Sequence, residues 1–396
     1  THRVIVMADL GDLREGFWDK DELVDVCVRV ERELPHVHLA GIGVNLTCYG
    51  STKPTPEKMN ELLALRRRHP GARLVLVCTS QVAPHAELLG LFDRIEAVED
   101  RGVFRLALSL ASILYRCRRM RPELSVNLEV YSRVAVFCGA LAGGRFRSGF
   151  YLEEETPVRG CYDMALPFAR RGRVYEYYDA LAGKLESPLP EPEELRERIC
   201  SEVPVPTVGG PLLVAAPFCS ALSFLRRWDF LSWGKFLTEF LTAHPEWRVL
   251  VIGGLKDAGH AREILAAVPP KLAERISSGC GRLSLRESVA AIHGSALFVG
   301  IDSAPLHWAR LTGRRVLSFW GATEPDLLLR PSPWLAETVI RVEAPCSPCV
   351  HSVERSRCSG RAACMAEISP ERVFTEAERL LRRPEPCLCR VALSMK

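Results

Sequence analysis

The chain has 396 residues, with 52 Lys and Arg against 48 Asp and Glu, a formal net charge of +4, and 47% hydrophobic residues. These values are typical of a globular protein and exclude a disordered, collagenous or coiled-coil chain. The small charge excess argues against a dedicated nucleic-acid-binding protein, so we expect no nucleic-acid partner. At roughly 100–200 residues per domain, the length predicts two domains.

No apolar run is long enough to cross a bilayer. The longest such run covers residues 103–115 and contains Arg105. The first residues lack the charged, apolar and small segments of a signal peptide, which predicts a cytoplasmic protein. Because the chain begins with Thr1 rather than Met, we expect it to be trimmed or to begin inside a longer gene product.

Short apolar runs alternate with amphipathic segments along the whole chain. In the first half, the pattern predicts strands at residues 3–8, 38–46, 73–78 and 125–128, and helices at 56–68 and 105–119. In the second half, it predicts strands at 212–216, 248–252, 297–301 and 315–319, and helices at 232–243, 261–267, 285–293, 305–311 and 370–383. Buried apolar strands separated by helices are typical of parallel sheets built from β–α–β units.

A Pro-rich segment separates the two halves. It contains SPLPEPEE and VPVPTVGGP, and such sequences predict a stiff, extended linker. The predicted fold class is therefore α/β, with two Rossmann-like doubly wound domains that face each other across a cleft and bind ligands at the carboxyl ends of their strands. We expect an N-terminal domain at 1–190, a linker at 191–210, a C-terminal domain at 211–370, and a final helix and tail at 371–396.

The most specific motif is FVGIDSAPLH at residues 298–307, a predicted strand, tight turn and helix start. Asp302 and Ser303 stand at the carboxyl end of the strand, where the first amides of the next helix suit a phosphate. His307 lies one turn into that helix. The next strand ends in WGATEP, a second loop at the same edge of the sheet. The alternative interpretation is a capped helix with a partly exposed histidine.

These motifs resemble those of glycosyltransferase family 9, the heptosyltransferases. The family pattern (V/G)-D-(T/S)-G-x-x-H stands here as GIDSAPLHWA, with Ala304 in place of the usual Gly, and F-G-x-T-(D/E)-P stands as FWGATEP. CGRLSLRE is similar to the family's G-x-x-S-L-x-E helix start. RRW at 226–228, followed by Trp233, is similar to its K-x-W loop. The resemblance runs from about residue 45 to 383.

The resemblance implies a GT-B fold and an inverting glycosyltransferase that uses a nucleotide sugar, ADP-heptose in most of the family. Asp302 would contact the sugar, Ser303 and the helix-start amides the diphosphate, and Arg226 the charge that develops on the leaving phosphate. The full set of donor-binding residues implied is Arg226, Asp302, Ser303, Ala304, His307 and Thr323. The resemblance implies no metal for the chemistry, and a lipopolysaccharide core sugar or a protein side chain as acceptor.

The family's presumed catalytic base is the Asp of a G-x-x-G-D loop in the N-terminal domain. Counting back from RRRHPGAR, this loop falls on Gly50, Ser51, Thr52 and Lys53, and Pro54 stands where the Asp is expected. Asp12, in the ADLGDL segment, is a candidate base because a carboxylate at a strand end suits proton removal. The second option is that another carboxylate is the base. In a purely structural role, Asp12 would form a turn or a helix cap. The third option is a divergent protein that binds nucleotide sugar as a regulator or partner subunit without transfer.

Fifteen cysteines, an odd number at low density, favour free thiols and one metal cluster over a disulfide framework. Cys346, Cys349, Cys358 and Cys364 form C-x2-C-x8-C-x5-C, which can converge on Zn²⁺ or Fe in a closed, structural site. Some members of the family carry a comparable cysteine finger. The alternatives are four reduced cysteines, replacement of one ligand by His351, or a thiol or metal module with a redox role.

Basic clusters occur at residues 66–73, 116–121 and 170–173. The favoured interpretation is solvated helix faces. The functional interpretation is a landing surface for anionic lipid or a phosphorylated saccharide, which would add peripheral contact with the inner face of the bacterial inner membrane.

Overall fold

The structure, a computed structural model of the chain, describes residues 2–8, 37–44, 73–100, 102–152, 156–169, 172–185, 192–205, 209–219, 224–349, 358 and 362–383. The chain divides into two compact units. Unit 1 comprises Thr1–Thr52, Val75–Ala83 and Ile95–Ala169, and unit 2 comprises Lys53–Leu74, Pro84–Arg94 and Arg170–Lys396.

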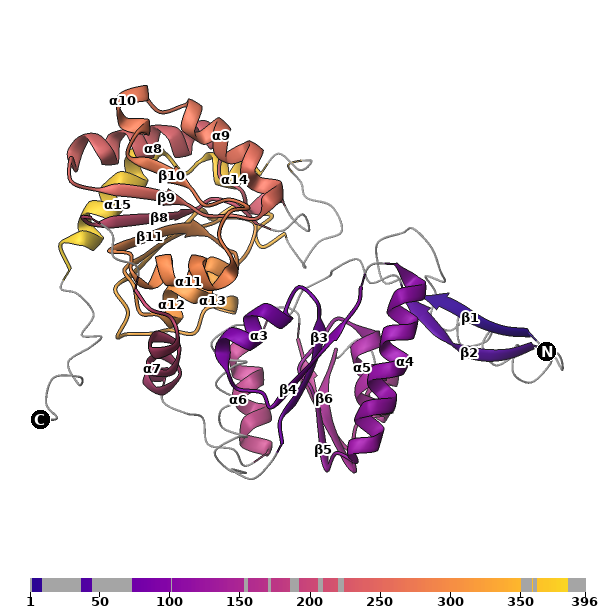
Figure 1. Ribbon diagram of the computed structural model, residues 1–396. Coiled ribbons are helices and arrows are strands. Elements are labelled where there is room, and N and C mark those ends of the chain that lie inside the picture. The colour runs from indigo at the N-terminus through magenta and orange to yellow at the C-terminus, as the bar shows by residue number, and fades with distance from the viewer. Residues whose placement is uncertain are drawn as a thin grey trace, which may run out of the picture. The chain divides into compact units, whose positions relative to one another are not determined.

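The first part of the chain forms three small sheets (Figure 1). Its strands are β1 (His2–Ala8), β2 (Val37–Val44), β3 (Val75–Thr79), β4 (Arg94–Val98), β5 (Leu124–Asn127), β6 (Phe146–Leu152) and β7 (Met164–Phe168). Its helices are α3 (Ala83–Leu89), α4 (Val103–Met120), α5 (Arg133–Leu141) and the 3-10 helix η1 (Thr156–Cys161). β1 pairs in parallel with β2, β3 pairs with β4, and β5, β6 and β7 form a parallel sheet.

The second part is built around one larger sheet. Its strands are β8 (Leu212–Ala216), β9 (Arg248–Val251), β10 (Ile276–Ser278), β11 (Leu297–Ile301), β12 (Val316–Trp320) and β13 (Glu337–Arg341). Its helices are α6 (Val174–Lys184), α7 (Pro192–Glu202), α8 (Phe230–Ala243), α9 (Ala258–Ala266), α10 (Pro270–Ala273), α11 (Leu285–His293), α12 (Ala304–Leu311), α13 (Pro325–Leu328), α14 (Ala363–Ala366) and α15 (Pro370–Leu381), with the 3-10 helices η2 (Phe224–Arg226) and η3 (Leu255–Asp257).

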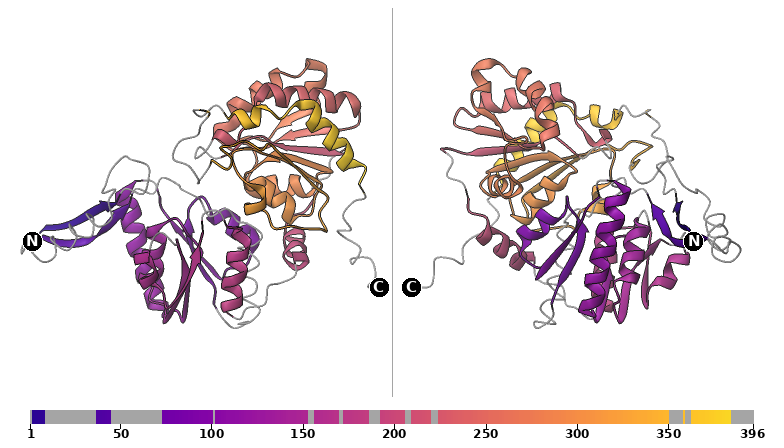
Figure 2. Two further views of the ribbon diagram at one scale, coloured as in Figure 1. Left: turned by 180° about the vertical axis from the view of Figure 1, so that it is seen from behind. Right: turned by 45° about the vertical axis from the view of Figure 1, so that its right-hand side comes forward.

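The six strands of the larger sheet are all parallel and are covered on both faces (Figures 1 and 2). Successive side chains of a strand point to opposite faces, so alternate residues enter different cores. Leu213 and Ala215 of β8 pack with α8, α9 and α15, whereas Leu212 and Val214 pack with α7, α11 and α12. A strand buried on both faces must be apolar throughout, which explains the unbroken apolar runs of the sequence.

The strand order β10-β9-β8-β11-β12-β13 gives this sheet a topological switch point. From β8 the chain winds outward to β10 and then returns to place β11 on the other side of β8. The loops after β8 and β11 therefore leave the sheet in opposite directions. In doubly wound sheets the crevice at such a point, at the carboxyl ends of the strands, is where ligands bind.

The parallel α/β class predicted from the sequence is confirmed, and the predicted strands of the second half agree with β8, β9, β11 and β12 to within one residue. One expectation about conformation is wrong. Within the segment predicted as an extended linker, the chain from Pro192 to Glu202 is helix α7. A proline at the first helical position, as at Pro192, favours a helix start. The predicted helix at 56–68 lies outside the described residues.

Candidate functional site at the end of the six-stranded sheet

An arginine and an aspartate meet at the switch point. Asp302 directly follows β11, and Arg226 ends η2 in the connection that follows β8. Nη1 of Arg226 donates a hydrogen bond to the main-chain oxygen of Asp302 at 2.8 Å and lies 3.4 Å from its carboxylate Oδ2. Arg226 is 6% exposed and Asp302 only 2%. The structure therefore joins two of the predicted donor-binding residues in a buried ion pair.

Trp228 anchors the loop that carries Arg226. Its indole ring is fully buried and packs edge-on against Trp233, with ring centroids 5.3 Å apart, and against Phe319 at 5.0 Å. Its Nε1 donates to the main-chain oxygen of Ile368 at 2.9 Å. A large ring fixed on three sides two residues beyond Arg226 restricts the positions that the guanidinium group can take.

The start of α12 lies beside this pair. Ser303 occupies the N-cap position, but its side chain makes no capping hydrogen bond and its Oγ instead donates to the main-chain oxygen of Ile301 at 3.3 Å. The alternative of an ordinary side-chain cap is therefore wrong. Pro305 has no amide hydrogen and the Leu306 amide donates to the main-chain oxygen of Ser303, so the Ala304 amide and the helix dipole are what this helix end offers to an anion. His307 is 2% exposed, so the prediction of a partly exposed histidine is also wrong.

The second predicted loop, Gly321–Thr323, follows β12 and is buried. The main-chain oxygen of Ala322 accepts a hydrogen bond from the amide of Cys349 at 3.0 Å. A Cβ atom added at Gly321 would lie 2.8 Å from Sγ of Cys364. Thr323 is 5% exposed. The cysteine-bearing segment thus packs directly against the loop that the resemblance assigns to donor binding.

Two further residues of the site were not predicted. Cys219 follows the end of β8, and burial raises the pKa of its thiol, although the charges of Arg226 and Arg227 act in the opposite direction. The guanidinium carbon of Arg227 lies 4.3 Å from the ring centroid of Phe224, and its Nη2 is 3.8 Å from Oδ1 of Asp257. Cys219 lies just beyond β8, and β8 pairs with β11, the strand that Asp302 follows. This position at the ligand-binding edge of the sheet could have identified Cys219 from the sequence.

The structure describes all four cysteines of the predicted cluster. Burial raises the pKa of the Cys364 thiol, and negative charge on Cys349, Cys346 and Cys358 acts in the same direction. Among the residues that the structure describes, however, no three or more Cys, His, Asp or Glu side chains are placed to hold a metal ion. The positions of these four thiols in the structure therefore do not by themselves form a metal site.

The acceptor-side predictions fall elsewhere. Asp12 and the loop of Gly50, Ser51, Thr52 and Lys53 lie outside the described residues. Within the described part of the chain, no helix is both long enough and apolar enough to cross a bilayer.

The chain is similar to known glycosyltransferases in sequence and in fold. Residues 170–359 match the model of glycosyltransferase family 9 (heptosyltransferase), which confirms the resemblance found in the sequence. Lipooligosaccharide heptosyltransferase 2 of Haemophilus influenzae is 30% identical over 111 residues, 28% of this chain and 32% of that protein. The family-model match at residues 170–359 includes the Arg226–Asp302 pair and both loops of the candidate site.

The solved structure of the ADP-heptose lipopolysaccharide heptosyltransferase II of Escherichia coli superposes with a TM-score of 0.63 at 18% identity, over 84% of this chain and 96% of that one. This likeness confirms the GT-B fold. A stretch of 62 residues, 16% of the chain, is 43% identical to 17% of an ornithine racemase of Acetoanaerobium sticklandii. The chain thus spans about a sixth of that racemase and a third of the Haemophilus protein.

Proposed function

We propose that this protein is a glycosyltransferase that transfers heptose from ADP-heptose to a hydroxyl group of a saccharide, such as a lipopolysaccharide core, or of a protein side chain. The observation that carries the proposal is the buried Arg226–Asp302 pair at the switch point of a sheet that matches glycosyltransferase family 9. The names of the similar heptosyltransferases support the choice of sugar and nucleotide. A nucleotide-sugar substrate also suits the cytoplasmic location expected from the sequence.

In this proposal the donor's diphosphate lies between Arg226 and the start of α12. The amide of Ala304 offers a hydrogen bond to a phosphate oxygen, and the start of α12 adds the positive end of the helix dipole. Pro305 has no amide hydrogen, and the Leu306 amide already donates to the main-chain oxygen of Ser303 at 3.1 Å. Arg226 supplies a full positive charge in a buried position, where electrostatic attraction is stronger than in water. Asp302 accepts from a sugar hydroxyl, and His307 and Thr323 complete the binding residues.

The proposed transfer is a single displacement at the anomeric carbon of the sugar. A base removes the proton of the acceptor hydroxyl, and the oxygen attacks the anomeric carbon from the face opposite the diphosphate. The bond from that carbon to the phosphate oxygen breaks, its electron pair leaves with ADP, and the sugar inverts its configuration. Arg226 and the Ala304 amide at the start of α12 stabilise the charge that develops on the departing oxygen. Because the chain itself provides this cation, the proposal uses no metal for the chemistry.

The acceptor side of the proposal rests on sequence alone. Asp12 is the proposed base, and Gly50, Ser51, Thr52 and Lys53 form the proposed acceptor loop. An Asp12→Asn variant should keep ADP affinity and lose turnover, because the amide cannot remove a proton at neutral pH. If turnover persists, another carboxylate is the base.

We also propose that Cys346, Cys349, Cys358 and Cys364 hold a structural Zn²⁺ or Fe ion. The support is their C-x2-C-x8-C-x5-C spacing in the sequence. Four thiolates suit either metal, and a closed site of four protein ligands would stabilise the fold without taking part in the transfer. Metal analysis of freshly purified protein tests this directly, and protein without bound metal would leave four reduced cysteines.

A screen of nucleoside diphosphates tests the donor. A ligand that binds only the folded state raises the melting temperature, so ADP should stabilise the protein more than UDP or dTDP does. Stabilisation by UDP or dTDP without an effect of ADP would overturn the assignment of ADP-heptose while leaving the fold unaffected.

Turnover of ADP-heptose in the presence of saccharide and protein acceptors tests the transfer. Arg226→Lys keeps the charge and loses the planar fork, so we expect turnover to fall about tenfold to a hundredfold. Arg262→Lys on α9, where the side chain is exposed, is the matched control and should match the wild type. Binding of ADP-heptose with neither transfer nor hydrolysis would favour the divergent, regulatory protein instead.

A further inference from the structure

The charges described so far at the proposed diphosphate site nearly cancel. Arg226 and Asp302 form a buried pair of opposite charges. At the start of α12 the Ala304 amide is the contact that remains, because Pro305 has no amide hydrogen and the next amide donates within the turn. Both phosphate groups of a donor diphosphate are negatively charged at neutral pH, and a buried charge needs a partner of opposite sign. The site as described therefore needs a further cation.

Arg227 stands next to Arg226 in the loop after β8. The pattern K-x-W leaves its second position open, and in this chain a second arginine occupies it. Arg227 follows η2 and precedes Trp228, whose ring is fixed against Trp233 and Phe319. Because both neighbours of Arg227 are buried and in fixed contacts, the two guanidinium groups extend from adjacent, well-placed positions of one loop.

The thiol of Cys219 shows that both guanidinium groups act at the same place. Burial raises the pKa of this thiol, and the charges of Arg226 and Arg227 act in the opposite direction, with a further contribution from a hydrogen bond of Arg227. The carboxylate of Asp302 also acts on this thiol. Electrostatic effects weaken with distance, so Arg227 belongs to the same neighbourhood as the Arg226–Asp302 pair.

Weak contacts hold the guanidinium group of Arg227. Its carbon lies 4.3 Å from the ring centroid of Phe224, a cation–π contact. Its Nη2 is 3.8 Å from Oδ1 of Asp257, which is longer than a hydrogen bond. Its Nε makes no hydrogen bond with any residue that the structure describes. Part of the hydrogen-bonding capacity of this group is therefore unused in the described part of the chain.

The carboxylate of Asp257 has partners other than Arg227. Its Oδ2 accepts a hydrogen bond from the amide of Gly254 at 2.9 Å. Asp257 also occupies the N-cap position of α9, where the helix dipole favours a negative charge. Asp257 is thus stabilised by its own segment, and a contact between Arg227 and a ligand would not leave it without a partner.

We propose that Arg227 is a second donor-binding arginine, which shares the negative charge of the diphosphate with Arg226. This inference rests on the proposed function and adds the means by which the site selects a diphosphate. A guanidinium group can donate two parallel hydrogen bonds to a phosphate, and two such groups match two phosphates. Arg227 therefore makes the site favour nucleoside diphosphates over monophosphates.

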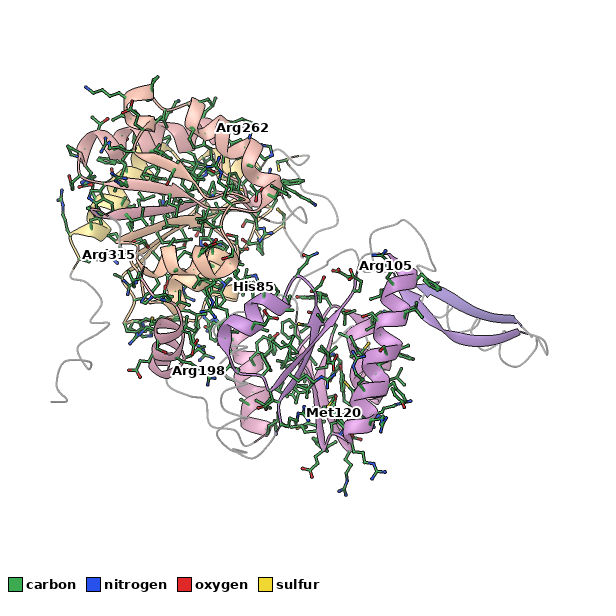
Figure 3. The ribbon with its side chains drawn as sticks, viewed as in Figure 1. His85, Arg105, Met120, Arg198, Arg262 and Arg315 are labelled. Atoms are coloured by element: carbon green, nitrogen blue, oxygen red, sulfur yellow. The ribbon has the colours of Figure 1, made fainter. Side chains whose placement is uncertain are left out.

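Calorimetric titration of the full chain with ADP and with AMP tests this role. The readout is the dissociation constant of AMP divided by that of ADP, because a general loosening of the site weakens both nucleotides together. Arg227→Met should lower this ratio about tenfold, the usual effect of losing a charge-assisted contact. Arg227→Lys keeps the charge and should retain most of the ratio. Arg262→Met, which removes an exposed cation from α9, is the matched control and should leave it unchanged (Figure 3).

Asp257→Asn supplies a second test with the opposite sign. The asparagine oxygen can still accept from Gly254, but the negative charge near Arg227 is gone. The arginine then attracts the diphosphate more strongly, so the ratio should rise about twofold or more. If Arg227 served only to hold Asp257, both variants would instead weaken ADP and AMP equally. Melting temperatures show which variants are folded, and if Arg227→Met is not, Arg227→Lys and Asp257→Asn decide the question.

The possible failures can be told apart. A wild-type ratio in folded Arg227→Met protein would overturn the role of Arg227 and leave the proposed function intact, and so would a lower ratio in Asp257→Asn. If the wild type binds UDP and not ADP, the assignment of ADP fails, and the same variants are then compared with UDP and UMP. A wild type that binds no nucleoside diphosphate would overturn the proposed function, and this inference with it.

Discussion

Removal of the Arg226 charge should lower both the stability of the protein and its affinity for ADP. Asp302 is 2% exposed, and an Arg226→Met variant removes the cation that lies 3.4 Å from its buried carboxylate. Breaking a buried pair by removing one partner costs about 3–5 kcal/mol. The Asp302→Asn variant leaves the buried guanidinium group in the same position and should cost a similar amount.

The double variant Arg226→Met/Asp302→Asn buries no unpaired charge at this place. Its loss of unfolding free energy in urea should be smaller than the sum of the single losses, with an interaction energy of about 2 kcal/mol. For ADP, loss of a charge-assisted contact of about 1.5–3 kcal/mol corresponds to a dissociation constant raised roughly tenfold to a hundredfold. Isothermal titration calorimetry measures that change for Arg226→Met.

A second buried pair provides the matched control. Arg310, at the other end of α12, is 3% exposed and its Nε lies 3.0 Å from Oε1 of Glu337. Arg310→Met should cost comparable stability and leave ADP affinity unchanged. Additive losses in the Arg226 and Asp302 cycle would show that the two groups do not form a pair. Equal ADP affinities in the Arg226→Met and Arg310→Met variants would contradict the role of Arg226 at the diphosphate.

Three further predictions concern the packing around the site. Burial lowers the pKa of His85 from 6.5 to about 4, so the unfolded chain binds a proton that the folded chain does not, and stability falls as the pH drops from 6.5 to 4. The loss is about 3 kcal/mol at most. His85→Gln, which can still accept from Nε1 of Trp308, should flatten that part of a plot of melting temperature against pH, and an unchanged slope would refute this cause. Gly321→Ala should cost about 1–3 kcal/mol, because the new Cβ would overlap Sγ of Cys364, and urea unfolding would measure it. Trp228→Phe leaves the main-chain oxygen of Ile368 without the indole donor, which should cost about 1–3 kcal/mol of unfolding free energy. Calorimetry should therefore give a lower melting temperature than that of the wild type.

The sequence predicted the centre of the larger sheet well and its edges poorly. β8 and β11 are buried on both faces, so every position is apolar and the pattern marks both ends of each strand. β10 has three residues, and β13 has only two apolar residues, which adjoin each other between polar ones. Neither strand therefore gives a clear apolar pattern in the sequence. In the first half of the chain, β6 and β7 were missed because their runs contain Gly, Arg and Pro.

The site could be predicted in part. Asp302 and Ser303 follow directly from a buried strand, since residues at its carboxyl end must lie at the ligand-binding edge of a parallel sheet. The contact of Arg226 with Asp302 joins residues that are 76 positions apart, and no periodicity reports such a contact. The family resemblance supplied Arg226. It did not supply Cys219, because the motif gives no chemical role to that position.

The segment after β13 stabilises the candidate site through packing, whether or not it binds a metal. Ile368 accepts the hydrogen bond of the Trp228 indole, and thus helps to hold the loop that carries Arg226. Cys349 donates its amide to Ala322, and Cys364 lies against Gly321, so both contacts act on the second loop. One segment therefore supports two loops that leave different strands of the sheet. It follows that a loss of order near the four cysteines, by metal removal or oxidation, should reach ADP binding through these contacts even though no cysteine of the cluster needs to touch the nucleotide.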